Sequence, residues 1–428
     1  MASTDGRIAD SFVQVLYDVL ARLMLALLDC NLLPDAVVRC ITRLLLASRL
    51  RSAYRPLADI RLSNLLHFVH SLREMAIAID TEKPKSQHYE VPTAFFKLVL
   101  GKHLKYRQDL RPFQNLLFEP GKNAILVFGK FQIISHVSSR EIDNVAIKVP
   151  DTSKLSQDLR EIQKTVLDYR HSCCFFPDKC STLEDAEKAM LELYCKRSQM
   201  KDGHYVLDIG CGWGAFSLYL AEKYPNSQIM GICNSTTQKA HIEEQCRDLE
   251  LKNVEIIVAD ISKFDMEASF DRIFSIGMFE HMKNYHSLLK KISRWMKPDG
   301  LLFVEYFCHK TFAYHFEVDS EEDWMGRHFF TGGTMPSSNL LLYFQEDVSI
   351  INHWLVNGKH YAQTSQEWLR RMDQNMSAIK PIMKSTYGKD SMVKWMVYWR
   401  VFFIATAELF GYNNGEEWMV SQFLFKKK

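Results

Sequence analysis

Three signatures that would place a 428-residue chain in a simple class are missing from this sequence. Its basic residues form no tract apart from Lys426–Lys428, and the formal net charge of +2 gives no reason to expect nucleic acid as a partner. The ten cysteines include no CxxC pair and no zinc-like spacing of cysteine and histidine. We therefore predict no metal site, and we expect reduced thiols in a cytoplasmic protein.

Long apolar runs are the third missing signature. The most apolar N-terminal stretch is interrupted by Asp18, Arg22 and Asp29. Its uncharged piece Leu23–Leu28 is far too short to span a bilayer. The apolar positions recur at helical spacing, which predicts an amphipathic helix packed on the protein. Similar patterns follow, so a helical N-terminal region is expected over 1–106, with its arginine-rich side facing either solvent or an anionic surface.

Strand-like and helix-like segments do alternate regularly, from residue 183 to about 310. Strands that alternate with helices of this length predict a parallel, doubly wound sheet with right-handed crossovers, a Rossmann-like α/β fold. With 47% hydrophobic residues, the chain can bury a core of that size. The sequence beyond 311 is mainly helical in pattern, and 417–425 is expected to return to the sheet as a last strand.

The glycine-rich segment GCGWG (210–214) follows the first of these strands and opens the first helix. Such a turn lets the backbone approach a ligand with no Cβ in the way. The dinucleotide fingerprint, GxGxxG with an acid about 20 residues further on, is not matched, because the second strand ends in Asn234. Asp208 before the turn and Asp260 at the end of the third strand favour the nucleoside of S-adenosylmethionine. A tight turn without a ligand is the alternative.

Several motifs in order carry a family resemblance. VLDIGCGWG (206–214), DRIFSIGMFEHM (271–282), HFFTGGTMPS (328–337) and SCCFF (172–176) resemble the cyclopropane-fatty-acid-synthase-like methyltransferases. Within that superfamily, EKPKSQHYEVPTAFFKLVLGKHLKY (82–106), NHWLVNGKHY (352–361) and YNNGEEWMVSQFLFKKK (412–428) resemble the plant coclaurine N-methyltransferases. The resemblance covers about 30–106 and 172–428.

This resemblance implies an S-adenosylmethionine-dependent N-methyltransferase that acts on a benzylisoquinoline-type or related amine. It implies a cofactor-binding core over 172–310 and a helical substrate cap with the final strand over 311–428. A small-molecule amine is the expected partner, and a homodimer is left open. Besides Asp208, the implied cofactor contacts are Ser172, Gly210, Gly212, Asn234, Gln238, Asp260, Ile261 and Ile276. For Gln238, a solvated helix position is the alternative.

Glu280 and His281 stand side by side just after an apolar run that predicts a buried strand. Methyl transfer to nitrogen needs a free lone pair, and a secondary amine is mostly protonated at neutral pH. Histidine titrates near pH 6.5 and can take that proton, while a neighbouring carboxylate holds the amine or stabilises the imidazolium. The pair is therefore predicted to be the acid–base pair, at a strand-to-helix turn. A helix-capping role for either residue is the alternative.

Aromatic residues are concentrated beyond the nucleotide-binding segment, and their flat apolar faces suit a benzylisoquinoline with a positive nitrogen. We select Phe329, Tyr398 and Trp399 as the predicted substrate contacts, against the alternative of core packing for each.

The sequence also departs from its plant relatives, which tend to have glutamate at the position of Gly277 and histidine at that of Glu305. Bacterial cyclopropane synthases carry a cysteine where Thr406 stands, and they bind a bicarbonate. A charge at Glu305 argues against that anion and hence against lipid cyclopropanation. The cyclopropane synthase remains the alternative enzyme, and a non-catalytic cofactor-binding homologue is the alternative from another class.

The largest departure is the segment 107–171, because the relatives join LKY directly to SC. It is either a true insertion, which should loop out from adjacent ends, or a gene-model artefact.

Overall fold

The structure is a computed structural model of the full chain, and it describes residues 23–54, 58–79, 92–100, 104–106, 169–171, 173–178, 180–316, 318 and 323–428. Contacts divide the chain into two units, one made of Met1–Pro112 and Asp168–Lys428 and the other of Phe113–Leu167. All the elements below belong to the first unit. The predicted insertion 107–171 lies outside the described residues except for its last three.

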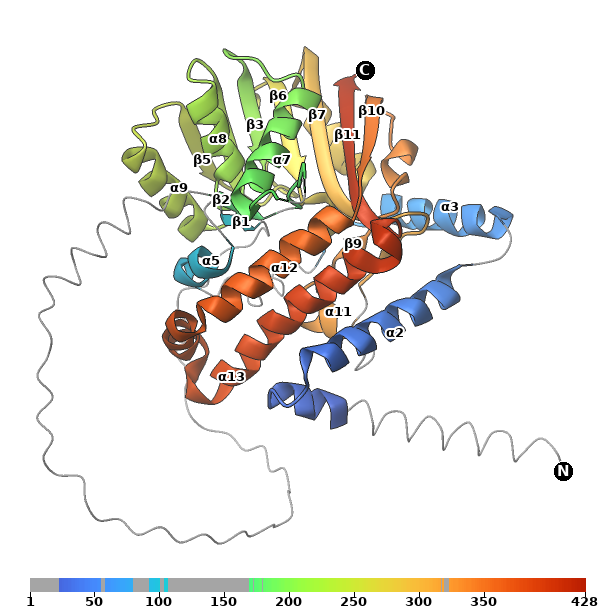
Figure 1. The fold of residues 1–428 in the computed structure, drawn as a ribbon. Helices are drawn as coiled ribbons and strands as arrows, with labels where there is room; N and C mark the ends of the chain where they lie inside the picture. Colours follow the sequence, from blue (N-terminus) through green and yellow to red (C-terminus); the bar gives the residue numbers. More distant parts are fainter. Residues whose placement is uncertain are drawn as a thin grey trace, which may run out of the picture. The chain divides into compact units, whose positions relative to one another are not determined.

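The central feature is a seven-stranded sheet with the order β10-β11-β7-β6-β3-β4-β5 (Figure 1). Its strands are β3 (Tyr205–Ile209), β4 (Gln228–Cys233), β5 (Val254–Val258), β6 (Phe270–Ile276), β7 (Met296–His309), β10 (Val348–Val356) and β11 (Trp418–Lys427). The pairs from β7 through β5 are parallel, and β11 runs antiparallel to both β7 and β10. The Rossmann-like α/β prediction and the returning last strand are confirmed.

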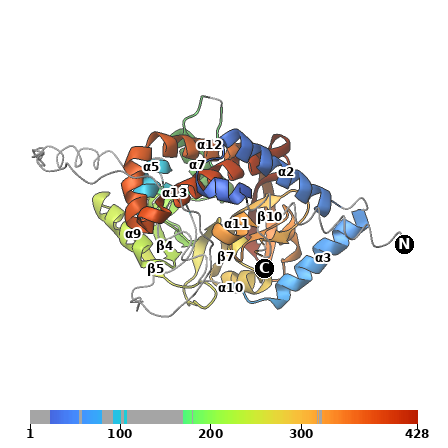
Figure 2. The same cartoon turned by 90° about the horizontal axis from the view of Figure 1, so that it is seen from below.

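Helices cover both faces of this sheet. They include α7 (Leu183–Arg197), α8 (Ala215–Lys223), α9 (Thr236–Asp248) and α10 (Tyr285–Arg294). Neighbouring residues on a strand point to opposite faces, and here Phe274 packs in the cluster that contains α7 residues while Ile273 packs in the cluster that contains α10 residues. Figure 2 shows α7 and α10 on the two sides of the strands.

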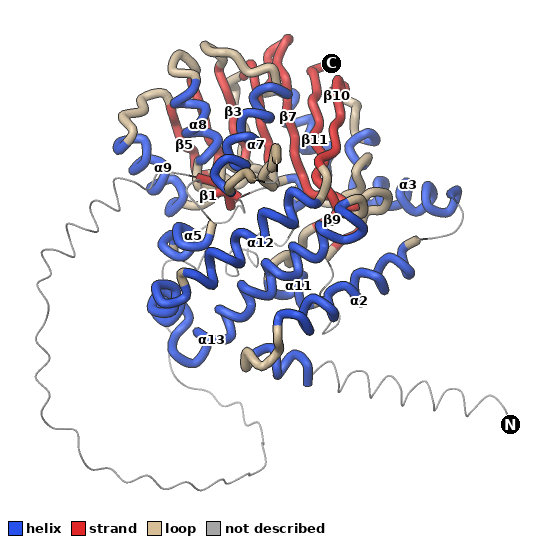
Figure 3. The backbone as a smooth tube through the Cα atoms, in the orientation of Figure 1, coloured by secondary structure: helices blue, strands red, loops and turns tan. Residues whose placement is uncertain are grey.

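A second, mainly helical part contains the N-terminal region and the predicted cap. Its elements are α2 (Asp35–Ala53), α5 (Thr93–Val99), α11 (Trp324–His328), α12 (Lys359–Gln374) and α13 (Met376–Gly411). Helix α3 (Ala58–Glu74) instead packs against α10 and belongs to the core of the main sheet. Helices α2, α5 and α12 each pack against α13, and Figure 3 shows α12 and α13 running beside each other beyond the strands. The long α13 breaks at Gly388, where φ is 79°.

The segment 311–428 is less purely helical than expected. Strand β10 lies within it and forms the edge of the main sheet, and β8 (Tyr314–His315) pairs with β9 (Thr334–Met335). The β10 sequence VSIINHWLV is rich in β-branched residues, which suit a half-buried strand. Short elements η1 (Phe279–His281), η2 (Leu340–Tyr343) and η3 (Tyr412–Gly415) complete the fold.

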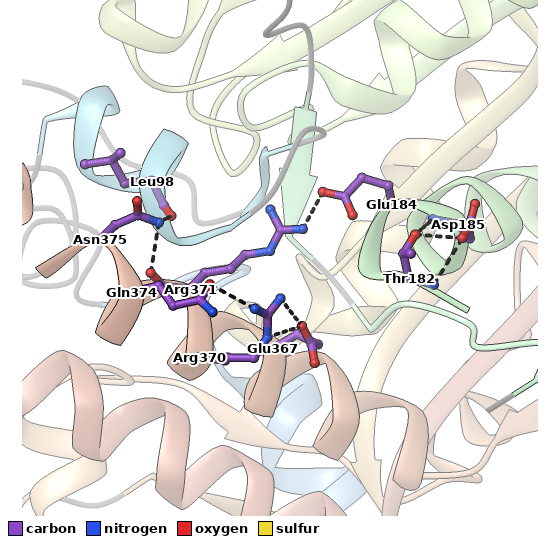
Figure 4. A network of polar contacts seen from close by, with 9 residues as sticks. All are labelled: Leu98, Thr182, Glu184, Asp185, Glu367, Arg370, Arg371, Gln374 and Asn375. Atoms are coloured by element: carbon purple, nitrogen blue, oxygen red, sulfur yellow. Dashed lines mark hydrogen bonds and ion pairs between the residues drawn. The ribbon is translucent and has the colours of Figure 1, made fainter. Parts of the chain in front are cut away.

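Two polar contacts fasten α12 to neighbouring helices (Figure 4). Arg371 forms an ion pair with Glu184 of α7, next to the capping box in which Thr182 and Asp185 begin that helix. The side-chain amide of Asn375 donates to the carbonyl oxygen of Leu98, just beyond the middle of α5, at 2.9 Å. The cap is thus joined to the sheet-covering layer on one side and to the N-terminal region on the other.

Candidate active site

The glycine turn lies where β3 ends, and all three of its glycines have left-handed backbone angles, with φ of 69° at Gly210, 55° at Gly212 and 88° at Gly214. Residues with a Cβ rarely adopt this conformation. The turn is fixed to β4 because the N–H of Cys211 donates to the carbonyl oxygen of Ile232 at 2.8 Å. Its backbone is therefore held in a defined conformation, as a ligand-binding turn requires.

The other predicted cofactor residues collect at the ends of the neighbouring strands β4 and β5. Asn234 follows β4 and is buried, and its Oδ1 has no hydrogen-bond partner within the described residues. Asp260 follows β5, and its Oδ1 accepts from the backbone N–H of Ser262 at 2.9 Å. In parallel sheets, ligands bind at the carboxyl ends of the strands. A glycine turn, an unsatisfied buried amide and a carboxylate at this edge fit S-adenosylmethionine.

The remaining predicted cofactor residues are buried. Gln238 is fully buried at the start of α9, where its N–H donates to the capping Ser235, so the alternative of a solvated position is wrong. Asp208 is also fully buried, and its Oδ2 accepts from the hydroxyl of Ser217 on α8 at 2.8 Å. Ile261 and Ile276 lie in the apolar core. Ser172 lies outside the described residues.

Glu280 and His281 lie on η1, between β6 and α10, which confirms the predicted strand-to-helix turn. Glu280 is 3% exposed, whereas His281 is partly exposed. The imidazole lies parallel to the ring of Phe330, with the centroids 6.0 Å apart and an interplanar angle of 5°. The two neighbours thus occupy different surroundings, one carboxylate in the core and one imidazole against an aromatic face.

The three predicted substrate contacts share one aromatic cluster. Phe329 stacks on Phe402 with the centroids 4.6 Å apart, and it meets Trp399 edge to face at 5.3 Å. The hydroxyl of Tyr398 donates to Asp29 of the N-terminal region at 2.8 Å. Phe329 and Trp399 are fully buried, which is the burial expected of core packing as well as of a closed aromatic wall.

Glu305 belongs to a polar network inside the fold. One of its oxygens accepts from the hydroxyl of Tyr194 on α7 at 2.6 Å, and the other accepts from the side-chain amide of Gln422 on β11. The carboxylate is 2% exposed. The carboxylate is therefore held by hydrogen bonds from α7 and β11.

Sequence reasoning counted Phe330 among the aromatic residues of the substrate side without selecting it, and it missed Lys283 as a site neighbour. Phe330 follows the selected Phe329 in the sequence, and only the fold shows which of the two rings faces His281. Lys283 is 1% exposed and lies two residues after His281. The sequence did offer a signal for Lys283, because a lysine within the short connection between a buried strand and a helix is unusual enough to consider as part of a site.

A separate apolar cavity of about 530 Å³ is lined by residues of α2 and α13, by Tyr314 and Phe316, and by residues within 24–33 and 323–326. None of the predicted site residues lines it. Within the described residues there is no group of histidine, cysteine, aspartate or glutamate that could hold a metal, and no helix is long and apolar enough to cross a membrane.

A Rossmann-like sheet with this glycine turn defines a nucleoside-binding α/β fold, and comparison with known proteins identifies the family. The model of the mycolic acid cyclopropane synthetase family matches residues 153–413. Two (S)-coclaurine N-methyltransferases are similar over nearly their whole length. The protein of Thalictrum flavum subsp. glaucum is 41% identical over 95% of each chain, and that of Papaver somniferum is 39% identical over 94% of this chain and 97% of its own.

A solved coclaurine N-methyltransferase, bound to N-methylheliamine and S-adenosylhomocysteine, superposes with a TM-score of 0.78 at 39% identity and covers 95% of this chain and 99% of its own. The chain belongs to the mycolic acid cyclopropane synthetase family and, within it, is a homologue of the coclaurine N-methyltransferases. It is an S-adenosylmethionine-dependent methyltransferase.

Proposed function

We propose that this enzyme methylates the nitrogen of a benzylisoquinoline-type or related secondary amine, with Glu280 and His281 as the acid–base pair. The names of its relatives support an amine as the methyl acceptor. The observation that carries the proposal is a buried carboxylate next to a partly exposed imidazole, on the turn after β6 and beside an aromatic ring. A cytoplasmic location and a role in alkaloid biosynthesis belong to the same proposal.

The charge of the buried Glu280 acts on the groups around it. A buried charge costs free energy unless a counter-charge or hydrogen bonds compensate it. Burial and, second to it, the charge of Glu280 raise the pKa of both Tyr285 and Cys308. A protonated amine is attracted by a carboxylate, so Glu280 is suited to hold the substrate nitrogen.

His281 is suited to take the proton. Its imidazole is partly exposed, so that a substrate can reach it, and the parallel ring of Phe330 limits how it turns. Bound S-adenosylmethionine supplies an electrophilic methyl group, which only a neutral amine can attack. A positioned base of this kind typically contributes about 10²–10⁴-fold to the rate. Asn234, Asp260 and the glycine turn would hold the cofactor.

The test is mass spectrometry of products from a panel of secondary and tertiary amines, including tetrahydroisoquinolines, with unsaturated phospholipid vesicles as a second substrate class. Addition of one methyl group to a secondary amine is the expected product. Methylene addition to the lipid would instead establish the cyclopropane synthase alternative. Cofactor binding without any product would indicate the non-catalytic alternative.

A further inference from the structure

Lys283 is a buried lysine close to the proposed base, and the proposed reaction does not use it. Its Nζ lies 2.7 Å from Thr334 Oγ1, 2.9 Å from His315 Nδ1 and 3.1 Å from the carbonyl oxygen of Gly333. A lysine ammonium has three donors, so these three contacts satisfy all of them. The side chain is 1% exposed, which leaves no room for water to replace these partners.

No carboxylate balances this charge within the described residues. Burial lowers the pKa of Lys283 to about 7. Burial and the charge of Lys283 also lower the pKa of His315 to about 4, so His315 is neutral and can accept through Nδ1. A buried cation without a counter-charge is destabilising relative to an apolar side chain. Stability alone is therefore a poor reason for a lysine at this place.

The acceptors of Lys283 lie on the β8–β9 pair and in the turn that follows Phe330. Two of them lie on the paired strands β8 and β9. The third, Gly333, closes a turn in which its own N–H donates to the carbonyl oxygen of Phe330 at 2.9 Å. Phe330 is the ring that lies parallel to the imidazole of His281. A short chain of contacts thus runs from Lys283 through Gly333 and Phe330 to His281.

Within the described residues, the main chain of Lys283 and its neighbour Asn284 are hydrogen-bonded to the end of α3 and the residues that follow it, and not to the β8–β9 segment. Its N–H donates to the carbonyl oxygen of Ile77 at 2.9 Å. The side-chain amide of Asn284 donates to the carbonyl oxygens of Arg73 and Met75, both at 2.8 Å. The backbone that carries Lys283 is therefore fixed to the end of α3, while its side chain reaches the β8–β9 segment.

We propose that Lys283 is a positioning residue, which fixes the turn of Phe330 against the turn of His281. It does not touch the substrate, and it acts through the orientation of the imidazole. This inference rests on the proposed role of His281 in methyl transfer. It predicts that the side chains of Lys283 and Phe330 influence turnover through the same link.

The test is a double-mutant cycle with Lys283→Met and Phe330→Leu. Each single variant is expected to lower kcat for the amine by roughly 10- to 100-fold, the size of effect that a misplaced reacting group produces. The affinity for S-adenosylhomocysteine should stay within about twofold. The loss of kcat in the double variant should be little more than the loss in the less active of the two single variants, because both changes break the same link. Thr334→Val, which removes only one acceptor, should show a smaller loss of the same kind.

Lys291→Met is the matched control. Lys291 also donates to three acceptors, the carbonyl oxygens of Ile261, Ser262 and Phe264, at 3.0 to 3.1 Å, but it shares none of them with Lys283. Its effect should be additive with that of Phe330→Leu.

Additive losses for Lys283→Met and Phe330→Leu, or an unchanged kcat in Lys283→Met, would overturn the proposal. If the unaltered enzyme methylates no amine, the proposed function fails on its own. In that case the same double-mutant cycle is carried out with the free energy of unfolding as the measured quantity. A coupling between Lys283 and Phe330 there would support the link, and additivity would overturn it.

Discussion

Gly277 and Glu280 face each other across the turn that follows β6: a Cβ at Gly277 would lie 3.7 Å from Oε1 of Glu280. That is ordinary contact distance, so space does not exclude a side chain here. The φ of 64° at Gly277 is unfavourable for other residues, at a cost of roughly 1–2 kcal/mol. The glycine thus leaves Glu280 without the second carboxylate that the plant relatives tend to have at this position.

Gly277→Glu is expected to change the pH dependence of methyl transfer. A second carboxylate next to Glu280 disfavours the doubly ionised state, so the acidic limb of the kcat/KM profile should move to higher pH. Gly277→Gln is the matched control, because it has the same size and the same backbone cost without the charge. Identical profiles for the two variants would show that the carboxylates do not interact.

The glycine turn gives a prediction for the cofactor. Gly212→Val should abolish binding of S-adenosylhomocysteine in calorimetry, because a branched side chain would occupy the space beside the backbone that the ligand approaches. Gly203→Val is the control, since Gly203 also has a positive φ, of 86°, but a Cβ there would meet nothing within 4 Å. Unchanged affinity in Gly212→Val would remove the turn from the cofactor site.

The role of His281 is tested by its pH dependence. His281→Ala should lower turnover by about 10²-fold or more near neutral pH, and the loss should shrink at higher pH, where more of the amine is already neutral. His286→Ala is the control, because His286 lies on the neighbouring helix α10 and contacts Glu346 at 3.4 Å. A loss in His281→Ala of less than about threefold at every pH would mean that the residue is structural.

Local patterns were enough to predict the alternating strands and helices, the glycine turn and the place of Glu280 and His281, since each of these depends on residues close together in the chain. Contacts between distant residues were not predictable in this way. Tyr398 meets Asp29 across 369 positions, and Lys283 meets Gly333 across 50. Gln238 was ambiguous because helical spacing alone does not show which face a neighbouring helix covers.

The buried His241 predicts a loss of stability in acid. Burial and the charge of Lys97 lower its pKa to about 4, from an unfolded value near 6.5. The folded state therefore favours the neutral ring, and the stability it confers is present above pH 6.5 and lost as the pH falls towards 4. His241→Phe should reduce the fall in unfolding free energy between pH 7 and pH 4 by roughly 3 kcal/mol.

Denaturant unfolding at several pH values measures this difference. His70→Phe is the control, because the side chain of His70 is 72% exposed and should not change the pH dependence. The same dependence in His241→Phe as in the unaltered protein would show that other groups control acid unfolding.

The last prediction is that residues 107–171 are dispensable. The two ends of the segment lie side by side, since β1 (Leu104–Tyr106), directly before it, pairs in parallel with β2 (Tyr169–His171), its own last three residues, and Tyr106 stands opposite His171. Adjacent strands are about 4.8 Å apart, and consecutive Cα atoms are about 3.8 Å apart. Because Ser172 directly follows His171, joining Tyr106 to Ser172 needs only a small local shift. The shortened chain should fold with a similar melting temperature and keep its methyl transfer.

A second deletion, of 107–152 alone, sharpens the test, because the family match begins at residue 153. If the whole segment is extraneous, both shortened chains should be as active as the full chain. If 153–171 contributes to the site, the shorter deletion should stay active while the longer one folds and loses methyl transfer. Loss of activity in both folded variants would show instead that the segment evolved as part of the enzyme, because restoring the direct connection would then remove something the reaction needs.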